Sequence, residues 1–292
     1  MTATTLGESL ARGLWTMDRF GVTPKKLAAR ALNRDQPRVL CVSFPKSGTH
    51  LIERALCLHP RLYRKMLPTV LSGHPDLVIA VGPGNLTARR YVKWGDLDRL
   101  LSRLRPGQVV MSHLAYRPDY SRIISARGAS SLFLMRDPRD IVVSEAHYQA
   151  GHRTHRLHEV FARQATLKDR LLLSIRGDRQ HGVLPIAEKL ERYSGWLASG
   201  AFVIRFEDLI GSAGGGEDAI RDATLRALFD HIGLPVDDAF LSWLAGRLIS
   251  TRSPTFRRGA IGSWRESFDD EVSEAFERAA GAYLQPYGYA PD

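Results

Sequence analysis

The chain has 292 residues, and its 44% hydrophobic content is enough for a packed core in one large domain or two small ones. Its 41 basic and 31 acidic residues leave a formal net charge of +10, which suits a polyanionic ligand, a nucleic acid or an anionic membrane surface. No segment approaches roughly eighteen consecutive apolar residues, and the N-terminus lacks the apolar run of a signal peptide, so we expect a cytoplasmic protein.

The N-terminal segment differs in character from the rest of the chain. Residues 1–35 are expected to form a helical extension packed on or next to a single domain of residues 36–292. Within the extension, residues 8–32 are basic and partly amphipathic, a pattern that also suits peripheral contact with a membrane or a partner. Packing against the chain's own domain is the more common role of such a stretch.

Residues 39–44 form a short apolar strand that runs into the turn Lys46-Ser-Gly-Thr49 and then into a helix. Backbone N–H groups and the positive end of the helix dipole converge at such a turn, and Lys46 adds a full charge. Gly48 lets the backbone come close to the anion's oxygens. The turn therefore predicts an anion cradle, with an ordinary strand-to-helix loop as the alternative. The lysine precedes the glycine by two positions, so this is not the Gly-Lys-Ser/Thr loop of common nucleotide triphosphatases.

Three further apolar runs, at residues 108–111, 131–135 and 201–206, are rich in Val, Ile, Leu and Phe and are separated by helical patterns. This alternation predicts an α/β fold in three layers, with a central, mostly parallel sheet and helices on both faces, as in P-loop nucleotide-binding proteins.

Helices are expected to start at Asp137-Pro138, at Pro185 and after Asp237, and a last helix is expected over residues 270–284. Residues 211–217 are mostly glycine and predict a flexible surface loop.

Each predicted strand ends next to a group that is capable of chemistry. These groups are Lys46, His113, Arg136 and the sequence Phe206-Glu207-Asp208. Because parallel strands bring their carboxyl ends to one edge of a sheet, we expect these groups to face a common cleft.

Two segments contain further phosphate ligands. Arg136 leaves a strand end and Ser144 lies two turns into the next helix, so one phosphate can be held between sheet and helix. Between them, Arg139 and Asp140 are expected to form a surface pair. Arg257 and Arg258 lie in a glycine-flanked loop that can wrap a second phosphate and become ordered when it is occupied.

Cysteine and histidine usage argues against disulfides and metal ions. Cys41 and Cys57 are expected to be buried and reduced. Four histidines have spacings that would suit zinc, but arginines lie among them and would repel a cation, so no metal site is expected. These histidines are His147, His152, His155 and His158.

Three segments resemble, in the same order, those of the cytosolic-type sulfotransferases that use 3′-phosphoadenosine 5′-phosphosulfate (PAPS). Residues 44–50 resemble the loop that binds the 5′-phosphosulfate. Residues 136–144 resemble the 3′-phosphate segment, and residues 257–259 resemble the Arg-Lys-Gly loop that covers the same phosphate. The resemblance spans most of the chain and implies a single sulfotransferase domain that needs no metal.

The resemblance also implies roles for individual residues. His113, in a segment similar to the family's Lys-Thr-His-Leu, is the general base, and Lys46 stabilises the leaving phosphate during in-line transfer. Ser144 holds the 3′ side or restrains Lys46, and Phe206 replaces a tyrosine that lines the adenine pocket. The full donor-binding set is Lys46, Ser47, Gly48, Thr49, His50, Arg136, Ser144, Phe206, Arg257, Arg258 and Gly259.

The expected function is transfer of a sulfuryl group from PAPS to a hydroxyl of a small-molecule acceptor. The acceptor's identity stays open. Met111 stands where many family members have a lysine, and Asp269-Asp270 replaces the Thr-Val of the family's dimer segment. Dimerisation through that segment is therefore not expected.

Two alternatives belong to other classes. A nucleotide-triphosphate-dependent kinase also uses a phosphate cradle after a strand. A noncatalytic polyanion-binding protein would suit the charge of +10. Since the sequence shows neither a tight Lys/Arg run nor zinc-finger spacing, nucleic acid is not an expected partner.

Overall fold

The structure, a computed structural model, describes residues 35–64, 70–72, 91–92, 96–153, 155–249 and 259–291. The predicted N-terminal extension lies outside these residues except for its last residue, and so do Arg257 and Arg258.

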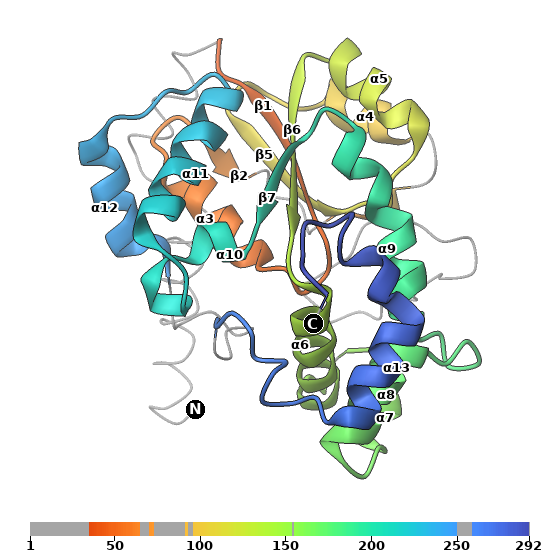
Figure 1. Cartoon of the computed structure of the whole chain (residues 1–292). Coiled ribbons are helices and arrows are strands. Elements are labelled where there is room, and N and C mark those ends of the chain that lie inside the picture. The colour runs from red at the N-terminus through yellow and green to blue at the C-terminus, as the bar shows by residue number, and fades with distance from the viewer. Residues whose placement is uncertain are drawn as a thin grey trace, which may run out of the picture.

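The described strands form one seven-stranded sheet in the order β4-β3-β5-β1-β6-β7, with β2 also paired to β5 (Figure 1). Every pairing between them is parallel. This confirms the predicted α/β fold class. The strands are β1 (Arg38–Ser43), β2 (Tyr63–Arg64), β3 (Val70–Ser72), β4 (Tyr91–Val92), β5 (Gln108–His113), β6 (Ala129–Met135) and β7 (Phe202–Arg205).

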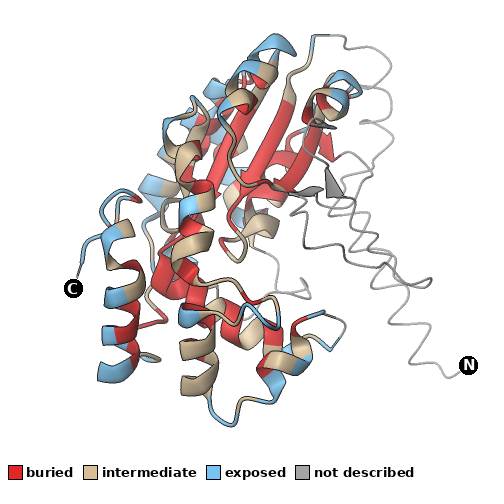
Figure 2. Ribbon diagram, turned by 90° about the vertical axis from the view of Figure 1, so that its right-hand side faces the viewer, coloured by how far each residue is buried: buried red, intermediate tan, exposed pale blue. Residues whose placement is uncertain are grey.

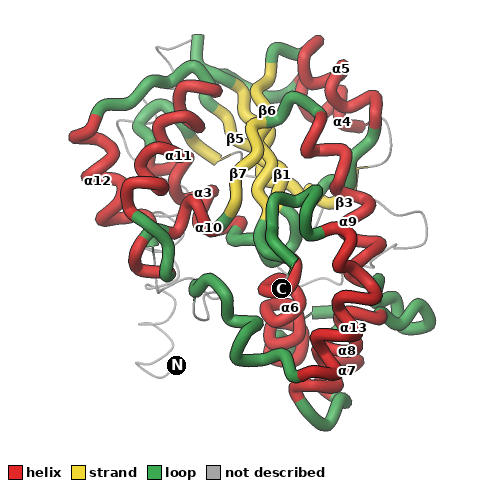
Figure 3. Tube along the Cα trace, viewed as in Figure 1, coloured by secondary structure: helices red, strands yellow, loops and turns green. Residues whose placement is uncertain are grey.

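Helices surround the sheet in three groups (Figures 1 and 3). One face is covered by α3 (Thr49–Leu58), α11 (Asp218–His231) and α12 (Asp238–Leu248). The other face is covered by α4 (Asp96–Ser102), α5 (Pro118–Ala126) and α9 (Ile186–Ser194). A third group extends beyond the carboxyl ends of the strands and consists of α6 (Pro138–Gly151), α7 (His158–Ala162), α8 (Leu167–Arg176) and α13 (Asp270–Ala280). The short helices are α10 (Glu207–Ile210), η1 (Gly195–Ala198), η2 (Ser212–Gly214) and η3 (Gly281–Tyr283).

The central strands are buried on both faces, as Figure 2 shows. Along β1, Val39 and Cys41 pack on the α3 side, whereas Leu40 and Val42 pack on the α9 side. This is the two-residue period of a strand, and it explains why the run is continuously apolar. Met111 packs in the same core as Cys41, so it does not contribute to the surface of the site.

The predicted helix starts are confirmed. Asp137 caps α6 by accepting the Arg139 N–H, Pro185 precedes α9, and Asp237 caps α12. The last helix, α13, is capped by Asp269, whose carboxylate accepts the Val272 N–H. In the described part of the chain, no helix is both long and apolar enough to cross a bilayer.

The glycine-rich segment 211–217 differs from the predicted flexible loop, because it forms the tight turn η2. The Gly214 carbonyl accepts a hydrogen bond of 2.9 Å from the Ile261 N–H. A Cβ atom on Gly214 would lie 2.6 Å from the Gly259 carbonyl oxygen. The glycines therefore allow two backbone segments to come into close contact, which explains the composition without requiring flexibility.

Candidate active site

Four neighbouring strands, β5, β1, β6 and β7, bring their carboxyl ends to one edge of the sheet (Figure 1). The groups predicted at those strand ends therefore follow adjacent strands, at the position where open α/β sheets bind ligands.

The loop between β1 and α3 has an unusual backbone. Lys46 has a φ of 72°, a left-handed conformation that costs a non-glycine residue energy. Gly48 has a φ of 95° and precedes α3 without providing a side-chain cap. A Cβ on Gly48 would lie 2.6 Å from the Phe206 ring, so only glycine fits there. The first turn of α3 thus presents N–H groups that have no acceptor within the helix, which is the geometry of an anion cradle.

The hydroxyl groups of this loop bind protein atoms. Ser47 is fully buried, with Oγ 2.7 Å from the Phe44 carbonyl oxygen and 3.1 Å from that of Leu134. Its side chain therefore ties the loop to β1 and β6. Thr49 Oγ1 lies 2.9 Å from Ser43 Oγ. The next residue of α3, His50, has Nδ1 3.2 Å from a Glu53 carboxylate oxygen.

His113 is held at the end of β5 in a defined orientation. Its Nδ1 lies 2.7 Å from the Ser43 carbonyl oxygen. Because a carbonyl only accepts, Nδ1 carries the proton, and the lone pair of the neutral ring is on Nε2. The Tyr193 hydroxyl donates to the His113 carbonyl at 2.9 Å and fixes the backbone on the α9 side. The ring is thus oriented to act as a base through Nε2.

The Lys46 ammonium lies over the face of the Tyr148 ring, with Nζ 3.3 Å from the ring centroid. Burial lowers the pKa of Lys46 to about 7, an effect that Glu145 opposes and Arg136 reinforces. An anion in the cradle would favour the charged form. The surroundings of Lys46 are therefore complementary to an anion.

Ser144 and Glu145 lie in the second turn of α6. Ser144 is half-buried, and its hydroxyl has no hydrogen bond to any residue that the structure describes. Glu145 is buried and binds Lys189 of α9 and Ser174 of α8. This carboxylate was not singled out from the sequence, because its partners come from two other helices.

Arg136 is buried where β6 ends. One of its terminal nitrogens, Nη2, donates to the Ala260 carbonyl at 2.6 Å and to Asp140 at 3.2 Å, and its guanidinium carbon lies 4.4 Å from the Phe206 ring centroid. Its Nε is buried and has no hydrogen-bond partner among the described residues. A buried, unpaired guanidinium N–H is costly, so this atom indicates a position for an anionic ligand.

Phe206 is buried between the Gly48 backbone and the Arg136 guanidinium. It therefore packs directly against both the β1–α3 loop and Arg136. Its role in lining an adenine pocket stays a prediction.

The predicted surface pair of Arg139 and Asp140 is wrong, because both residues are buried. Asp140 accepts hydrogen bonds from the Gly262 N–H at 2.9 Å and the Trp264 N–H at 3.1 Å, in addition to Arg136. Arg139 instead pairs with Asp137 at 2.8 Å and stacks on Trp264. The C-terminal segment covers this first turn of α6, which a helix pattern alone does not reveal.

Gly259, the described end of the predicted arginine loop, has a φ of 60°. The segment that follows it is anchored at three points: Arg136 binds the Ala260 carbonyl, Gly214 binds the Ile261 N–H, and Asp140 binds the Gly262 N–H. The described residues that directly follow Arg257 and Arg258 in the sequence therefore lie beside Arg136.

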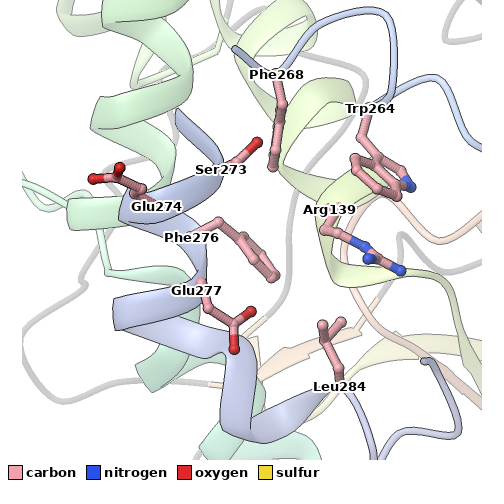
Figure 4. Close-up of a pocket in the computed structure, with 8 residues that line it drawn as sticks. All are labelled: Arg139, Trp264, Phe268, Ser273, Glu274, Phe276, Glu277 and Leu284. Atoms are coloured by element: carbon pink, nitrogen blue, oxygen red, sulfur yellow. The ribbon is translucent and has the colours of Figure 1, made fainter. Parts of the chain in front are cut away.

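A separate cavity of about 340 Å³ lies between α13 and Trp264 (Figure 4). Its lining includes two carboxylates, Glu274 and Glu277. The arginine in the lining, Arg139, is already paired with Asp137. This charge balance does not suit a phosphate. The lining residues are Arg139, Trp264, Phe268, Ser273, Glu274, Phe276, Glu277 and Leu284, none of which belongs to the predicted donor-binding set.

Both cysteines are buried and free, as predicted. Burial raises the pKa of the Cys41 thiol, so it is no candidate nucleophile. Among the described residues, no three His, Cys, Asp or Glu side chains are grouped so that they could hold a metal ion.

Two solved structures resemble the chain closely in fold. The mouse sulfotransferase SULT7A1, complexed with PAP, has a TM-score of 0.56 and 15% identity over 93% of this chain and 92% of that chain. Retinol dehydratase, in complex with androsterone and the inactive cofactor PAP, has a TM-score of 0.56 and 18% identity over 92% of this chain and 87% of that chain. No protein-family model and no curated protein matches the sequence. The chain therefore has the sulfotransferase fold.

The buried hydrogen bonds of Asp140 with Arg136, Gly262 and Trp264 should stabilise the fold. Asp140→Ala should lower the free energy of unfolding by about 3–5 kcal/mol, because it leaves buried Arg136 without its carboxylate. The matched control is Asp98→Ala, which breaks the exposed pair with Arg127 and should change little. Urea denaturation of both variants measures the free energy of unfolding. Equal losses in the two variants would contradict a stabilising role for Asp140.

Proposed function

We propose that this protein is a PAPS-dependent sulfotransferase that transfers a sulfuryl group to a hydroxyl of a small-molecule acceptor. The observation that carries the proposal is the position of His113, whose oriented ring is hydrogen-bonded to the last residue of β1, the strand that leads into the Lys46 cradle. A base and an anion cradle on adjacent strand ends are what transfer of an anionic group to a hydroxyl requires.

The site residues suit a donor that has two separate phosphate groups. The backbone around Gly48 and Thr49, together with Lys46, would hold the 5′-phosphosulfate. Arg136 would hold the 3′-phosphate through its buried Nε, which has no partner in the described part of the protein, and Ser144 and the loop of residues 257–259 would complete that contact. Phe206, between the two, would support the adenosine.

The reaction follows from these positions. The acceptor oxygen attacks the sulfur while Nε2 of His113 takes the hydroxyl proton. The bond between sulfur and the 5′-phosphate oxygen breaks, and the Lys46 ammonium stabilises the charge that builds on that oxygen. The products are the sulfated acceptor and 3′,5′-bisphosphoadenosine (PAP). The fold shared with retinol dehydratase, whose structure contains androsterone, supports a small-molecule acceptor.

Replacing the base should separate turnover from binding. His113→Ala should lower kcat by about two to four powers of ten and leave PAP affinity nearly unchanged, because the ring acts on the acceptor's proton. Release of PAP from PAPS, measured with a panel of phenols, alcohols and sugars, gives kcat, and calorimetry gives affinity. The control is His181→Ala, whose imidazole pairs with Asp178 on the surface. Normal turnover in His113→Ala would exclude this residue as the base.

Arg136 should contribute to binding only when the ligand has a 3′-phosphate. Arg136→Gln should weaken PAP binding about ten- to a hundredfold, since a hydrogen bond to a charged group contributes about 1.5–3 kcal/mol. The affinity for adenosine 5′-phosphate, which has no 3′-phosphate, should fall much less. Both ligands are titrated into the same variant, so any effect of the substitution on folding is common to both measurements. Equal losses would show that Arg136 does not contact the 3′-phosphate.

Lys46 should make donor binding depend on pH. Its pKa is about 7 in the free protein and should rise when a phosphate pairs with the ammonium. Above pH 7 the amine must therefore gain a proton on binding, and PAP affinity should fall as pH rises, by up to about tenfold per pH unit. Calorimetry at pH 8.5 in two buffers of different ionisation enthalpy should show uptake of about one proton that Lys46→Met abolishes. No uptake by the unmodified protein would contradict this role for Lys46.

A further inference from the structure

Tyr148 lies in the third turn of α6 and presents its ring face to the Lys46 ammonium, at 3.3 Å from the centroid. It is four residues after Ser144, so the two side chains project from the same side of α6. The left-handed backbone of Lys46 lies at the start of the cradle. The loop thus places its one full positive charge against α6.

The Tyr148 ring is a charge-stabilising group in direct contact with the Lys46 ammonium. Within the described part of the chain, Lys46 forms no ion pair with a carboxylate, and Glu145 binds Lys189 and Ser174 instead. The face of an aromatic ring attracts a cation, and the attraction is strongest where water is excluded. The contact therefore supports the charged form of Lys46 in a buried setting.

The Tyr148 ring is itself held in place. The His152 ring stacks on it with centroids 4.7 Å apart, and the His155 ring meets it edge-on at 5.6 Å. These two imidazoles and Tyr148 form a small aromatic cluster at the C-terminal end of α6. A ring fixed in this way can hold the ammonium in one defined position.

We propose that Tyr148 is a positioning residue that holds the Lys46 ammonium on its ring face until the donor's phosphate takes its place. The proposal rests on the proposed function, because it assigns the resting state of the same lysine. It adds a resting contact for Lys46 to the binding and transfer roles already assigned to this lysine.

The charges around Lys46 determine what removal of the ring should do. Arg136, from the end of β6, lowers the pKa of Lys46, and Glu145, from α6, raises it. His152 and His155 lie against Tyr148. If the ring stabilises the cation, removing it lowers the pKa of Lys46 further. If the ring only excludes water, removing it lets water solvate the ammonium and raises that pKa. The two roles predict opposite signs.

The test is a pH titration of Lys46 by NMR in full-length protein labelled with ¹³C-lysine, with its signal assigned from a Lys46→Arg variant. Tyr148→Phe keeps the ring and should titrate like the unmodified protein, at a pH of about 7. Tyr148→Leu should titrate about one pH unit lower. Pentafluorophenylalanine at position 148 keeps the ring's shape but removes its negative face, so it should also lower the pKa of Lys46 by about one unit. This variant provides the test if Tyr148→Leu does not fold.

An unchanged or raised pKa of Lys46 in the leucine and pentafluorophenylalanine variants would overturn the proposal. Addition of PAP separates this outcome from failure of the proposed function. PAP should raise the pKa of Lys46 in the unmodified protein. If PAP does not raise this pKa, the assignment of the donor site fails. The effect of the ring is measured without PAP, so its result does not depend on that assignment.

Discussion

The turn between β1 and α3 depends on one buried hydroxyl group. Ser47 Oγ lies between the carbonyl oxygens of Phe44 and Leu134 and so fastens the turn to two adjacent strands. With Ser47 fixed, its neighbours Lys46 and Gly48 both take left-handed conformations. The energy stored in the backbone at Lys46 is offset by these buried contacts, as is common where a loop must present its backbone to a ligand.

The proposed second phosphate position is assembled from segments that are distant in the sequence. Arg136 and Asp140 come from the end of β6 and the start of α6, and they bind the backbone of residues 260–264. The η2 turn holds the same segment through Ile261. The described residues that follow Gly259 are therefore held by the same segment that provides the buried Arg136 guanidinium.

The strands β1, β5, β6 and β7 and the predicted helix starts each have a local cause, so they were predictable. The short strands β2, β3 and β4 were not predicted. The continuous apolar run of β1 reflects burial on both faces of a parallel sheet, and Asp137-Pro138 starts α6 by capping and by its fixed φ. The convergence of His113 with the cradle followed from the rule that parallel strands end at one edge, and the contact of His113 with Ser43 agrees with it.

Other features depend on partners that the sequence order hides. Asp140 was mistaken for a surface residue because its hydrogen-bond donors, Gly262 and Trp264, are more than a hundred residues away along the chain. The contact between Lys46 and Tyr148 and the packing of Gly214 against Gly259 have the same origin. Periodicity identifies which residues belong to an element, but it does not show which other segment covers them.

The proposed function requires that this sheet edge bind an adenosine nucleotide with phosphates at both the 3′ and 5′ positions. The most direct measurement is calorimetric titration with PAP, compared with ADP and with magnesium-ATP under the same conditions. We expect PAP to bind at one site and much more tightly than either control, because only PAP has a 3′-phosphate that can reach Arg136. Preference for magnesium-ATP would favour a kinase. Absence of binding by all three nucleotides would contradict the donor site and favour a protein that binds polyanions without catalysis.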